Sequence, residues 1–327
     1  GEVYKTLLNM QSTSDSLRHL VGIMNLPTDL KQRAIASANR RAHTKELREY
    51  LVKQYPEKTS GLMDMEPIVF SNVHFAYELE YGREASLLTR KNSHEGLDRK
   101  IEIMQGSMVC VVGPRSEGKA TLLKILGGVI IPPDSGIFIP AHLRILHVAA
   151  EPYFYKDSMY KNLTFGLHPD SPGASKERVK AICISLGVNE YALRYLEEPT
   201  VGDSDDGGEK WSLVLSLTDR HLLNLARAFV FDPEVLVLHK PTMPFDERVS
   251  SQVLKVMREF VTDRGLHWDS EQKTLRRPRT LIMSSAKIQG VLAADRILRV
   301  TKAGGVEELQ QSKGDVGTDS FSTRPLR

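Results

Sequence analysis

The sequence predicts an α/β fold built around a parallel β-sheet, and three observations lead to this prediction. Short apolar runs such as Val235–Leu238 (VLVL) have the pattern of strands that are buried on both faces. Segments with helical spacing of apolar residues separate these runs, among them Lys176–Leu186 and Asp219–Phe231. A glycine-containing turn at residues 113–118 joins an apolar strand to an apolar helix. Strands that alternate with helices indicate a parallel sheet.

The expected elements follow in order along the chain. Before the glycine-containing turn we expect a helical region interrupted at Pro27, a polar linker, a strand, a loop and a pair of short strands, at residues 1–55, 56–65, 67–75, 81–100 and 101–112. After the turn we expect a helix that starts at Thr121, strands at 143–148 and 280–283, and a helix at 250–262. The tail from residue 310 is polar and predicted to be disordered.

Composition excludes several classes of protein. A net charge of +3 over 327 residues is too small to indicate a nucleic-acid partner. The two cysteines, Cys110 and Cys183, lack the number and spacing of a disulfide framework or a metal site. We find no apolar run long enough to cross a membrane, and a start at Gly1 suggests a piece of a longer protein. The basic segment Leu275–Arg279 (LRRPR) is interpreted as a solvated loop.

The turn has the pattern of a phosphate-binding loop. Residues 113–121 read GPRSEGKAT, which fits G-x-x-x-x-G-K with alanine in place of the usual serine or threonine at the next position. Glycines let backbone N–H groups close around phosphate, and the lysine adds positive charge at the helix N-terminus. We therefore predict a nucleotide-phosphate site made of Gly113, Pro114, Arg115, Ser116, Glu117, Gly118, Lys119, Ala120 and Thr121. Val235–Leu238 is expected on an adjacent parallel strand, with Lys119 and His239 on the same side of the domain.

Several further segments, in order, resemble the ATP-binding cassette (ABC) family, and within it the exporter type. They are FSNVHFAY at 70–77, EP at 151–152 with the stretch to Gly166, TVGD at 200–203, LARA at 225–228, VLVLHKP at 235–241 with Asp246, TLIMSS at 280–285 and ADRILRV at 294–300. The resemblance covers about residues 66–309 and makes Tyr77 the candidate for stacking on adenine. It implies an α/β, P-loop NTPase-like parallel core sheet, a small antiparallel β subdomain around 67–112 and a helical subdomain around 153–218.

The sequence departs from the family at the positions that bind metal and activate water. Ala120, Ala150, His239, Lys240 and Ala286 align with the magnesium-binding hydroxyl, the Q-loop glutamine, the Walker B aspartate, the catalytic glutamate and the H-loop histidine. The signature motif becomes LSLTD at 215–219, which keeps Ser216 but loses both glycines. We therefore predict no catalytic residue and no metal ligand. His239 and Lys240 have two interpretations: drift after loss of hydrolysis, or basic groups that replace the charge of magnesium.

The resemblance implies a nucleotide-binding domain of an exporter-type transporter, at the cytoplasmic face of a membrane. Residues 1–65 would follow a transmembrane region of the same polypeptide, residues 66–309 would form the cassette, and residues 310–327 a disordered tail. The domain would bind ATP weakly, with magnesium doubtful, pair with an identical or different second cassette, and pass its closure to transmembrane helices. Two alternatives stay open: an active transport ATPase with non-standard catalytic groups, and a soluble ABC-like scaffold with no transport role.

Overall fold

The computed structural model describes most of the chain. The described residues are 14, 16–25, 28–58, 61–71, 75–78, 84–88, 100–131, 136–197, 210–301 and 305–309, with the backbone alone for 75–78, 84–88 and 210. The chain separates into two compact units, residues 1–39 and residues 40–327. Helix α2 (Leu30–Gln54) runs across this boundary, and residues 16–24 are also helical, as predicted. Among the described residues, no helix has the length and apolar character needed to cross a bilayer.

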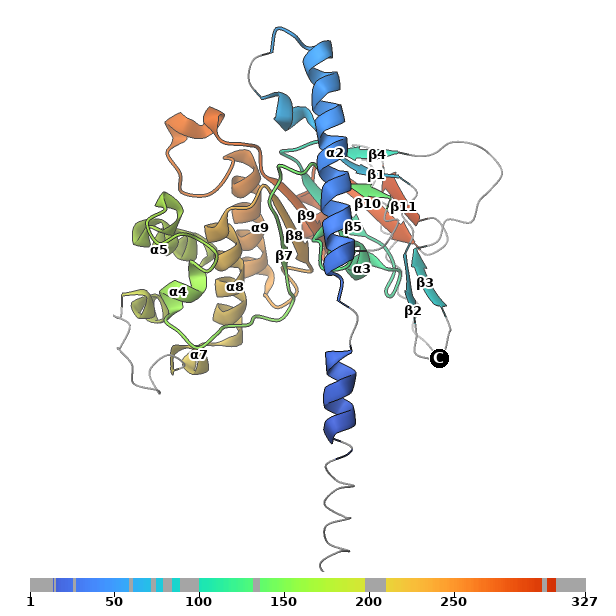
Figure 1. Cartoon of the computed structure of the whole chain (residues 1–327). Coiled ribbons are helices and arrows are strands. Elements are labelled where there is room, and N and C mark those ends of the chain that lie inside the picture. The colour runs from blue at the N-terminus through green and yellow to red at the C-terminus, as the bar shows by residue number, and fades with distance from the viewer. Residues whose placement is uncertain are drawn as a thin grey trace, which may run out of the picture. The chain divides into compact units, whose positions relative to one another are not determined.

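A six-stranded sheet forms the centre of the second unit, in the order β11-β10-β5-β9-β8-β7 (Figure 1). Its strands are β5 (Met108–Val112), β7 (Ile145–Val148), β8 (Val235–His239), β9 (Thr280–Ser284), β10 (Arg296–Thr301) and β11 (Gly305–Leu309). All neighbouring pairs are parallel except β10 with β11. The predicted parallel core sheet is therefore confirmed. The expectation that β8 lies next to β5 is wrong, because β9 lies between them.

The smaller antiparallel part contains the early strands. Strand β1 (Ile68–Phe70) pairs with both β4 (Ile101–Ile103) and β6 (Ile137–Phe138). Strand β2 (Phe75–Glu78) pairs with β3 (Glu84–Leu88) in a hairpin. Strand β3 lies within residues 81–100, which we expected to be a loop. That prediction fails here because cross-strand pairing with β2, rather than local hydrophobic alternation, defines the strand.

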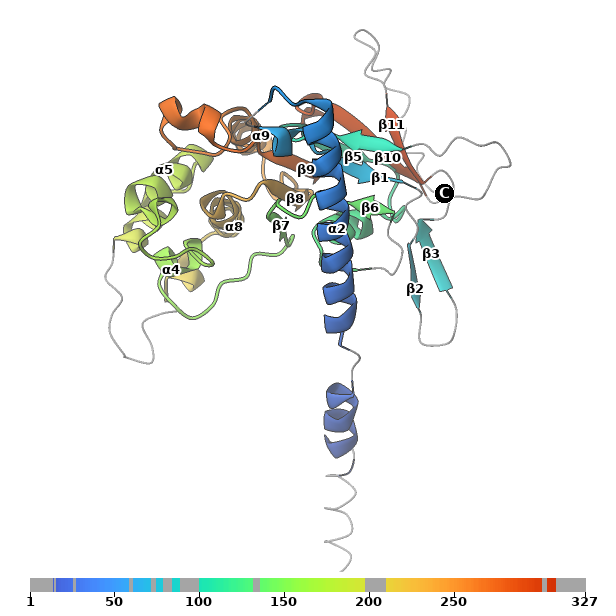
Figure 2. The ribbon, with the colours of Figure 1, turned by 45° about the horizontal axis from the view of Figure 1, so that its top comes forward.

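The helices form two apolar cores, one on each face of the central sheet. Alternation along β8 divides its side chains: Leu236 and Leu238 belong to the core with α5, α8 and α9, and Val235 and Val237 to the core with α3. The longer helices are α3 (Lys119–Leu126), α5 (Lys176–Leu186), α8 (Leu217–Phe231) and α9 (Glu247–Thr262). Shorter helical segments are α4 (Met159–Leu163), α6 (Glu190–Leu193), α7 (Lys210–Val214) and α10 (Ile288–Leu292). Figure 2 shows α4 and α5 beside α8. Helices α4 and α5 fall within the helical subdomain predicted around residues 153–218, whereas α8 lies almost wholly beyond it.

Candidate phosphate-binding site

The predicted phosphate loop connects β5 to α3 and lies tightly against β10. Gly113 has a φ of 145°, and a Cβ at this position would lie 2.2 Å from the carbonyl oxygen of Val300. Ser116 and Gly118 also have positive φ values, of 61° and 94°, and Gly118 is the N-cap of α3. Glycine is required at position 113 both for backbone conformation and for space. The loop therefore turns sharply and brings backbone N–H groups to the start of α3.

Lys119 lies across this loop. Its Nζ donates to the carbonyl oxygen of Gly113 at 2.6 Å and also to that of Pro114. Burial lowers the pKa of Lys119, and the charge of Lys240 lowers it further, whereas Glu117 acts in the opposite direction. The ammonium group is thus held at the loop by two backbone oxygens and lies within the electrostatic field of the end of β8. Of the other predicted loop residues, Pro114, Arg115 and Ser116 are exposed, Ala120 is half-buried, and Thr121 is buried.

The end of β8 brings two basic residues to the same side of the sheet. His239 Nδ1 lies 2.8 Å from the hydroxyl of Ser284 on β9, and the backbone N–H of Lys240 donates to that hydroxyl at 3.1 Å. Burial lowers the pKa of His239, and the positive charges of Lys240 and then Lys119 lower it further. His239 and Lys119 are therefore close enough to interact, as we expected. Lys240 itself has a left-handed φ of 49°, a conformation that costs about 1–2 kcal/mol in a non-glycine residue.

A small cavity of about 30 Å³ lies beside His239 and Lys240. It is lined by the end of β7 with the residues that follow it, by the N-terminal half of α8, and by the turn after β8. His221 and Asn224 contribute polar groups from α8, and Asn224 Nδ2 donates to the carbonyl oxygen of Ala149 at 3.2 Å. Burial lowers the pKa of His221. The cavity has room for one or two water molecules, and no aspartate or glutamate is among the residues that line it.

The N-terminus of α8 is closed by its own side chains. Ser216 Oγ accepts the backbone N–H of Asp219 at 3.0 Å and donates to the Asp219 carboxylate at 2.6 Å. The other oxygen of that carboxylate accepts the backbone N–H of Asn189 at 3.2 Å. Ser216 is the N-cap of α8, and its hydroxyl satisfies one of the free N–H groups of the helix start. Ser216 is thus engaged within its own helix, with a negative charge beside it.

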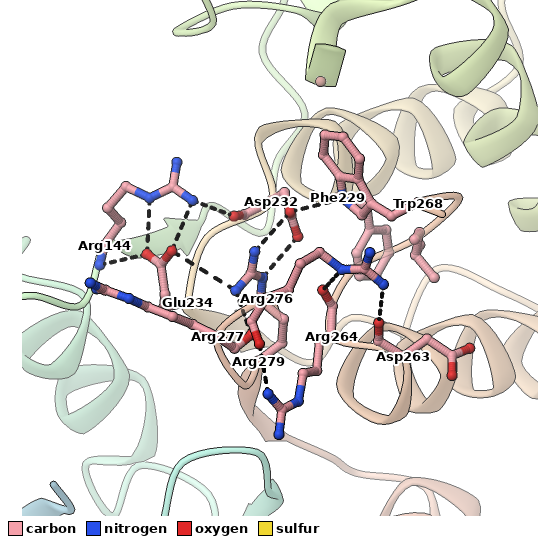
Figure 3. A network of polar contacts seen from close by, with 12 residues as sticks. Arg144, Phe229, Asp232, Glu234, Asp263, Arg264, Trp268, Arg276, Arg277 and Arg279 are labelled. Carbon is pink, nitrogen blue, oxygen red and sulfur yellow. Dashed lines mark hydrogen bonds and ion pairs between the residues drawn. The ribbon is translucent and has the colours of Figure 1, made fainter. Parts of the chain in front are cut away.

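The interpretation of residues 275–279 as a solvated loop is wrong for the end of the segment: Leu275 and Arg277 are exposed, but Pro278 and Arg279 are buried. Arg279 pairs with Asp232 through two hydrogen bonds of 2.9 Å, and its side chain is 6% exposed. Arg276 donates to backbone carbonyl oxygens of the same insertion, and Arg277 donates to that of His142. Figure 3 shows the guanidinium group of Arg279 directed toward Asp232, and that of Arg276 beside Asp263 and Arg264. The arginines therefore fasten the insertion to the sheet, at the end of β8 and β9 away from His239.

Some positions that the sequence singled out lie outside the described residues, are described by their backbone alone, or carry only an exposed alanine side chain. Only the backbone of Tyr77 is described, within β2, and residues 200–203 lie outside the described residues. Ala150 and Ala286 are exposed. Two groups that sequence reasoning missed are Ser284 and Asp219, which bond the histidine and the helix start, respectively. A capping pattern, S-x-x-D, could have indicated the second, whereas only strand register reveals the first.

Comparisons with known proteins place this geometry among ABC cassettes. No family model matches the chain. It is 26% identical over 291 residues to ABC multidrug transporter E of Aspergillus fumigatus. This match covers 79% of the chain and 20% of the transporter. It is 24% identical over 229 residues to the spermidine/putrescine import ATP-binding protein PotA of Borreliella afzelii. This match covers 64% of the chain and 61% of that protein. The chain thus spans about three fifths of that relative's length, and less of the transporter's.

Solved structures share the fold. A bacterial Atm1-family ABC exporter with ATP bound matches 75% of the chain and 39% of the exporter chain, with a TM-score of 0.54 and 22% identity. The ATP-binding cassette MJ0796, in a dimeric post-hydrolysis state with ADP and phosphate, matches 75% of the chain over its whole length, with a TM-score of 0.53 and 16% identity. At these identities the likeness is one of fold.

Proposed function

We propose that this chain, a nucleotide-binding domain of the ABC type, binds ATP through its phosphate loop and does not hydrolyse it efficiently. The observation that carries the proposal is the pairing of an intact loop lysine with basic side chains at the end of β8. Two loop carbonyl oxygens accept hydrogen bonds from the Lys119 ammonium group. Lys119 also interacts electrostatically with Lys240 and with His239. The loop and the N-terminus of α3 attract phosphate, and the basic groups add to that attraction.

The residues around the loop do not suit magnesium. Magnesium requires hard oxygen ligands in octahedral geometry. The side chains at the family's ligand positions are those of Ala120, Ala150 and His239, and Nδ1 of the histidine is already bonded to Ser284. Within the described part of the chain, no group of three or more histidine, cysteine, aspartate or glutamate side chains is arranged to hold a metal ion. We therefore derive no step through a metal.

Charge favours the free nucleotide. ATP carries roughly four negative charges at neutral pH, since the second ionisation of a terminal phosphate has a pKa near 6. Relative to the family pattern, the site has lost two carboxylates and gained the ammonium group of Lys240, a change of three positive units. This exceeds the charge of the ion that is lost. Metal-free ATP is accordingly expected to bind at least as well as its magnesium complex, and salt should weaken binding by screening.

Hydrolysis lacks a general base at the expected position. A positioned base typically contributes about 10²–10⁴ in rate. Lys240 occupies the place of the family's catalytic glutamate, and a protonated amine cannot accept the proton of an attacking water molecule. The active-ATPase alternative would require another base. His239 is one candidate, because burial and then the charges of Lys240 and Lys119 lower its pKa and so favour the neutral imidazole. Its donor role, argued below, disfavours that alternative.

We also propose that the domain works at the cytoplasmic face of a membrane, with a transmembrane region of the same polypeptide and a second cassette as partners. The exporter-like order of motifs and the similarity to a piece of a multidrug transporter support this proposal. At the start of α8, the Ser216 hydroxyl is engaged by Asp219 and a carboxylate lies beside it, which disfavours phosphate binding at this helix start. A soluble scaffold is the alternative. If a longer version of the protein, with the sequence upstream of Gly1 included, is found in the membrane fraction, this alternative is excluded.

Calorimetric titration of the purified chain with ATP tests the proposal. We expect binding in the presence of EDTA that is equal to or tighter than binding with magnesium. Lys119→Ala should abolish binding in both conditions, whereas Lys156→Ala, a change on the loop that follows β7, should not. Binding that requires magnesium, or that survives Lys119→Ala, would overturn the proposal.

A further inference from the structure

We infer that Ser284 fixes the His239 imidazole in the tautomer protonated at Nε2, so that the end of β8 presents a neutral hydrogen-bond donor to a phosphate oxygen. The identity of the ligand rests on the function proposed above, but the tautomer does not. Ser284 thus acts as a positioning residue for the imidazole of His239.

The Ser284 hydroxyl has one proton to donate and two lone pairs. Its side chain is fully buried, with 0% exposure. The backbone N–H of Lys240 donates to Oγ at 3.1 Å, so one lone pair is used. Among the described residues, the one acceptor within reach of the hydroxyl proton is His239 Nδ1, at 2.8 Å. The hydroxyl therefore donates to Nδ1, which must carry a lone pair, and the imidazole proton lies on Nε2.

The opposite tautomer would leave a buried donor without a partner. If Nδ1 carried the proton, Ser284 would accept two hydrogen bonds and its own hydroxyl proton would have no acceptor among the described groups. Leaving a buried donor unpaired disfavours that state on the order of ten-fold or more. The preference comes from this chain's strand register, which pairs His239 of β8 with Ser284 of β9.

The resulting Nε2–H group lies in the candidate site. His239 lines the same cavity as Lys240, and no described residue bonds its Nε2. The charged and titratable groups that act on the ring are Lys240, Lys119, His147 and Lys124, and all of them favour the neutral imidazole. A cation would need the Nε2 lone pair, which is absent in this tautomer. A phosphate oxygen needs a donor, and that is what Nε2–H supplies.

The shared chemistry of the ligand is a polyphosphate anion without bound metal. The terminal phosphates of ATP and free tripolyphosphate both offer such oxygens, whereas adenosine offers none. Neutral hydrogen bonds of this kind change affinity by about two- to ten-fold. Removing the Ser284 hydroxyl should therefore weaken polyphosphate binding by a similar factor, because the tautomer that donates would no longer be favoured.

The first measurement is made on the ligand-free chain. A long-range proton–nitrogen NMR spectrum with isotope-labelled histidine, at about pH 8 where an imidazole is neutral, distinguishes the two tautomers. The His239 signals are identified by their loss in His239→Gln. We expect the Nε2–H form in the wild type and a mixture in Ser284→Ala. The neighbouring Ser285→Ala, which removes a hydroxyl bonded to Lys287 and not to His239, should leave the spectrum unchanged. An Nδ1–H form or a mixture in the wild type would overturn the inference.

The second measurement adds ligand in EDTA. ATP and tripolyphosphate should each shift the Nε2 resonance of His239, and adenosine should not. If ATP binds by calorimetry but the Nε2 resonance does not move, the donor role is refuted while the proposed function stands. If neither polyphosphate binds, the proposed function fails, and with it the donor role, although the tautomer measurement remains decisive for Ser284.

Discussion

Arg279 and Asp232 form a buried ion pair at one end of strands β9 and β8, and Ser284 and His239 are bonded at the other end. Arg279 precedes β9 and Asp232 lies three residues before β8, and their side chains are 6% and 9% exposed. Trp268 Nε1 also donates to Asp232, at 3.0 Å. The carboxylate is thus surrounded by donors. The pair, seen in Figure 3, joins the segments that precede β8 and β9, the two strands whose opposite ends contribute His239 and Ser284.

Replacement of Arg279 by methionine should destabilise the domain strongly. The change leaves the Asp232 carboxylate buried without its main partner, and breaking a buried pair in this way costs about 3–5 kcal/mol. Urea unfolding followed by circular dichroism measures the loss. Lys180→Met is the control, because it removes an exposed pair with Glu197 at 2.6 Å; it should leave the unfolding midpoint nearly unchanged. Equal effects of the two variants would contradict a structural role for the buried pair.

Mild acid should destabilise the fold through histidines whose pKa is lowered in the folded chain. Burial is the main cause that lowers the pKa of His147, His221, His239 and His267 from the ordinary value of 6.5. Below 6.5 the unfolded chain therefore binds protons that the folded chain does not. The free energy of unfolding should accordingly be constant above this pH and fall as the pH drops through it.

Unfolding curves at a series of pH values measure this slope. His147→Gln should reduce it, because it removes a half-buried imidazole that lies against Gly127 and whose pKa is lowered by burial and by the charge of Lys124. His168→Gln, at an exposed position, serves as the control and should leave the slope as it is. A stability that rises as the pH falls from 7 to 5 would contradict the proton linkage.

The sequence predicts the strands and helices of the central sheet well, because apolar runs and periodicity are local signals. Lys176–Leu186 and Val235–Leu238 occur where they were expected. Strand order is not local, and β9 therefore separates β5 from β8 against our expectation. Arg277 and Arg279 illustrate the same limit. Their charge suggests exposure to solvent, but the groups that they bind, the carbonyl oxygen of His142 and the Asp232 carboxylate, lie 135 and 47 residues away in sequence.

In the candidate site, too, the sequence predicts the local features and misses those that depend on the pairing of distant segments. The phosphate loop is recognisable from glycine and lysine spacing, and the structure gives it the strand–turn–helix context that the pattern requires. Ser284 could not be recognised, because its relation to His239 depends on a parallel register between segments 45 residues apart in sequence. Tyr77 remains a sequence prediction.

Gly113→Ala should be far more damaging than Gly128→Ala. Both glycines have positive φ values, of 145° and 66°. A Cβ at 113 would meet the Val300 backbone oxygen at 2.2 Å, whereas a Cβ at 128 would meet nothing within 4 Å. Gly128→Ala should therefore lower the free energy of unfolding only by the cost of a left-handed backbone in alanine, about 1–2 kcal/mol. Thermal unfolding compares the two, and similar midpoints would mean that the loop can move away from β10.

Tyr77→Ala should weaken ATP binding by roughly ten-fold, and Tyr77→Phe should leave it nearly unchanged. The prediction follows from stacking of a base on an aromatic ring, which contributes about 1–3 kcal/mol. Tripolyphosphate binding should be unaffected by either variant, because that ligand has no base. Fluorescence titration with a labelled ATP analogue measures the difference. Unchanged ATP affinity in Tyr77→Ala would make this residue a packing aromatic of the β2–β3 hairpin.

Lys240→Glu should restore the residue type that the family uses as catalyst without restoring turnover. Ala120, Ala150 and His239 would still supply no oxygen ligand for magnesium, so the metal's charge at the terminal phosphate would remain missing. The same change should weaken metal-free ATP binding, because it replaces a positive charge near Lys119 with a negative one. Lys240→Gln, which only removes charge, should have about half that effect on the binding free energy. Single-turnover assays of phosphate release, run with magnesium and with EDTA and with Lys119→Ala as the blank, measure the outcome. Magnesium-dependent release by the wild-type chain that disappears in Lys119→Ala would establish the active-ATPase alternative instead.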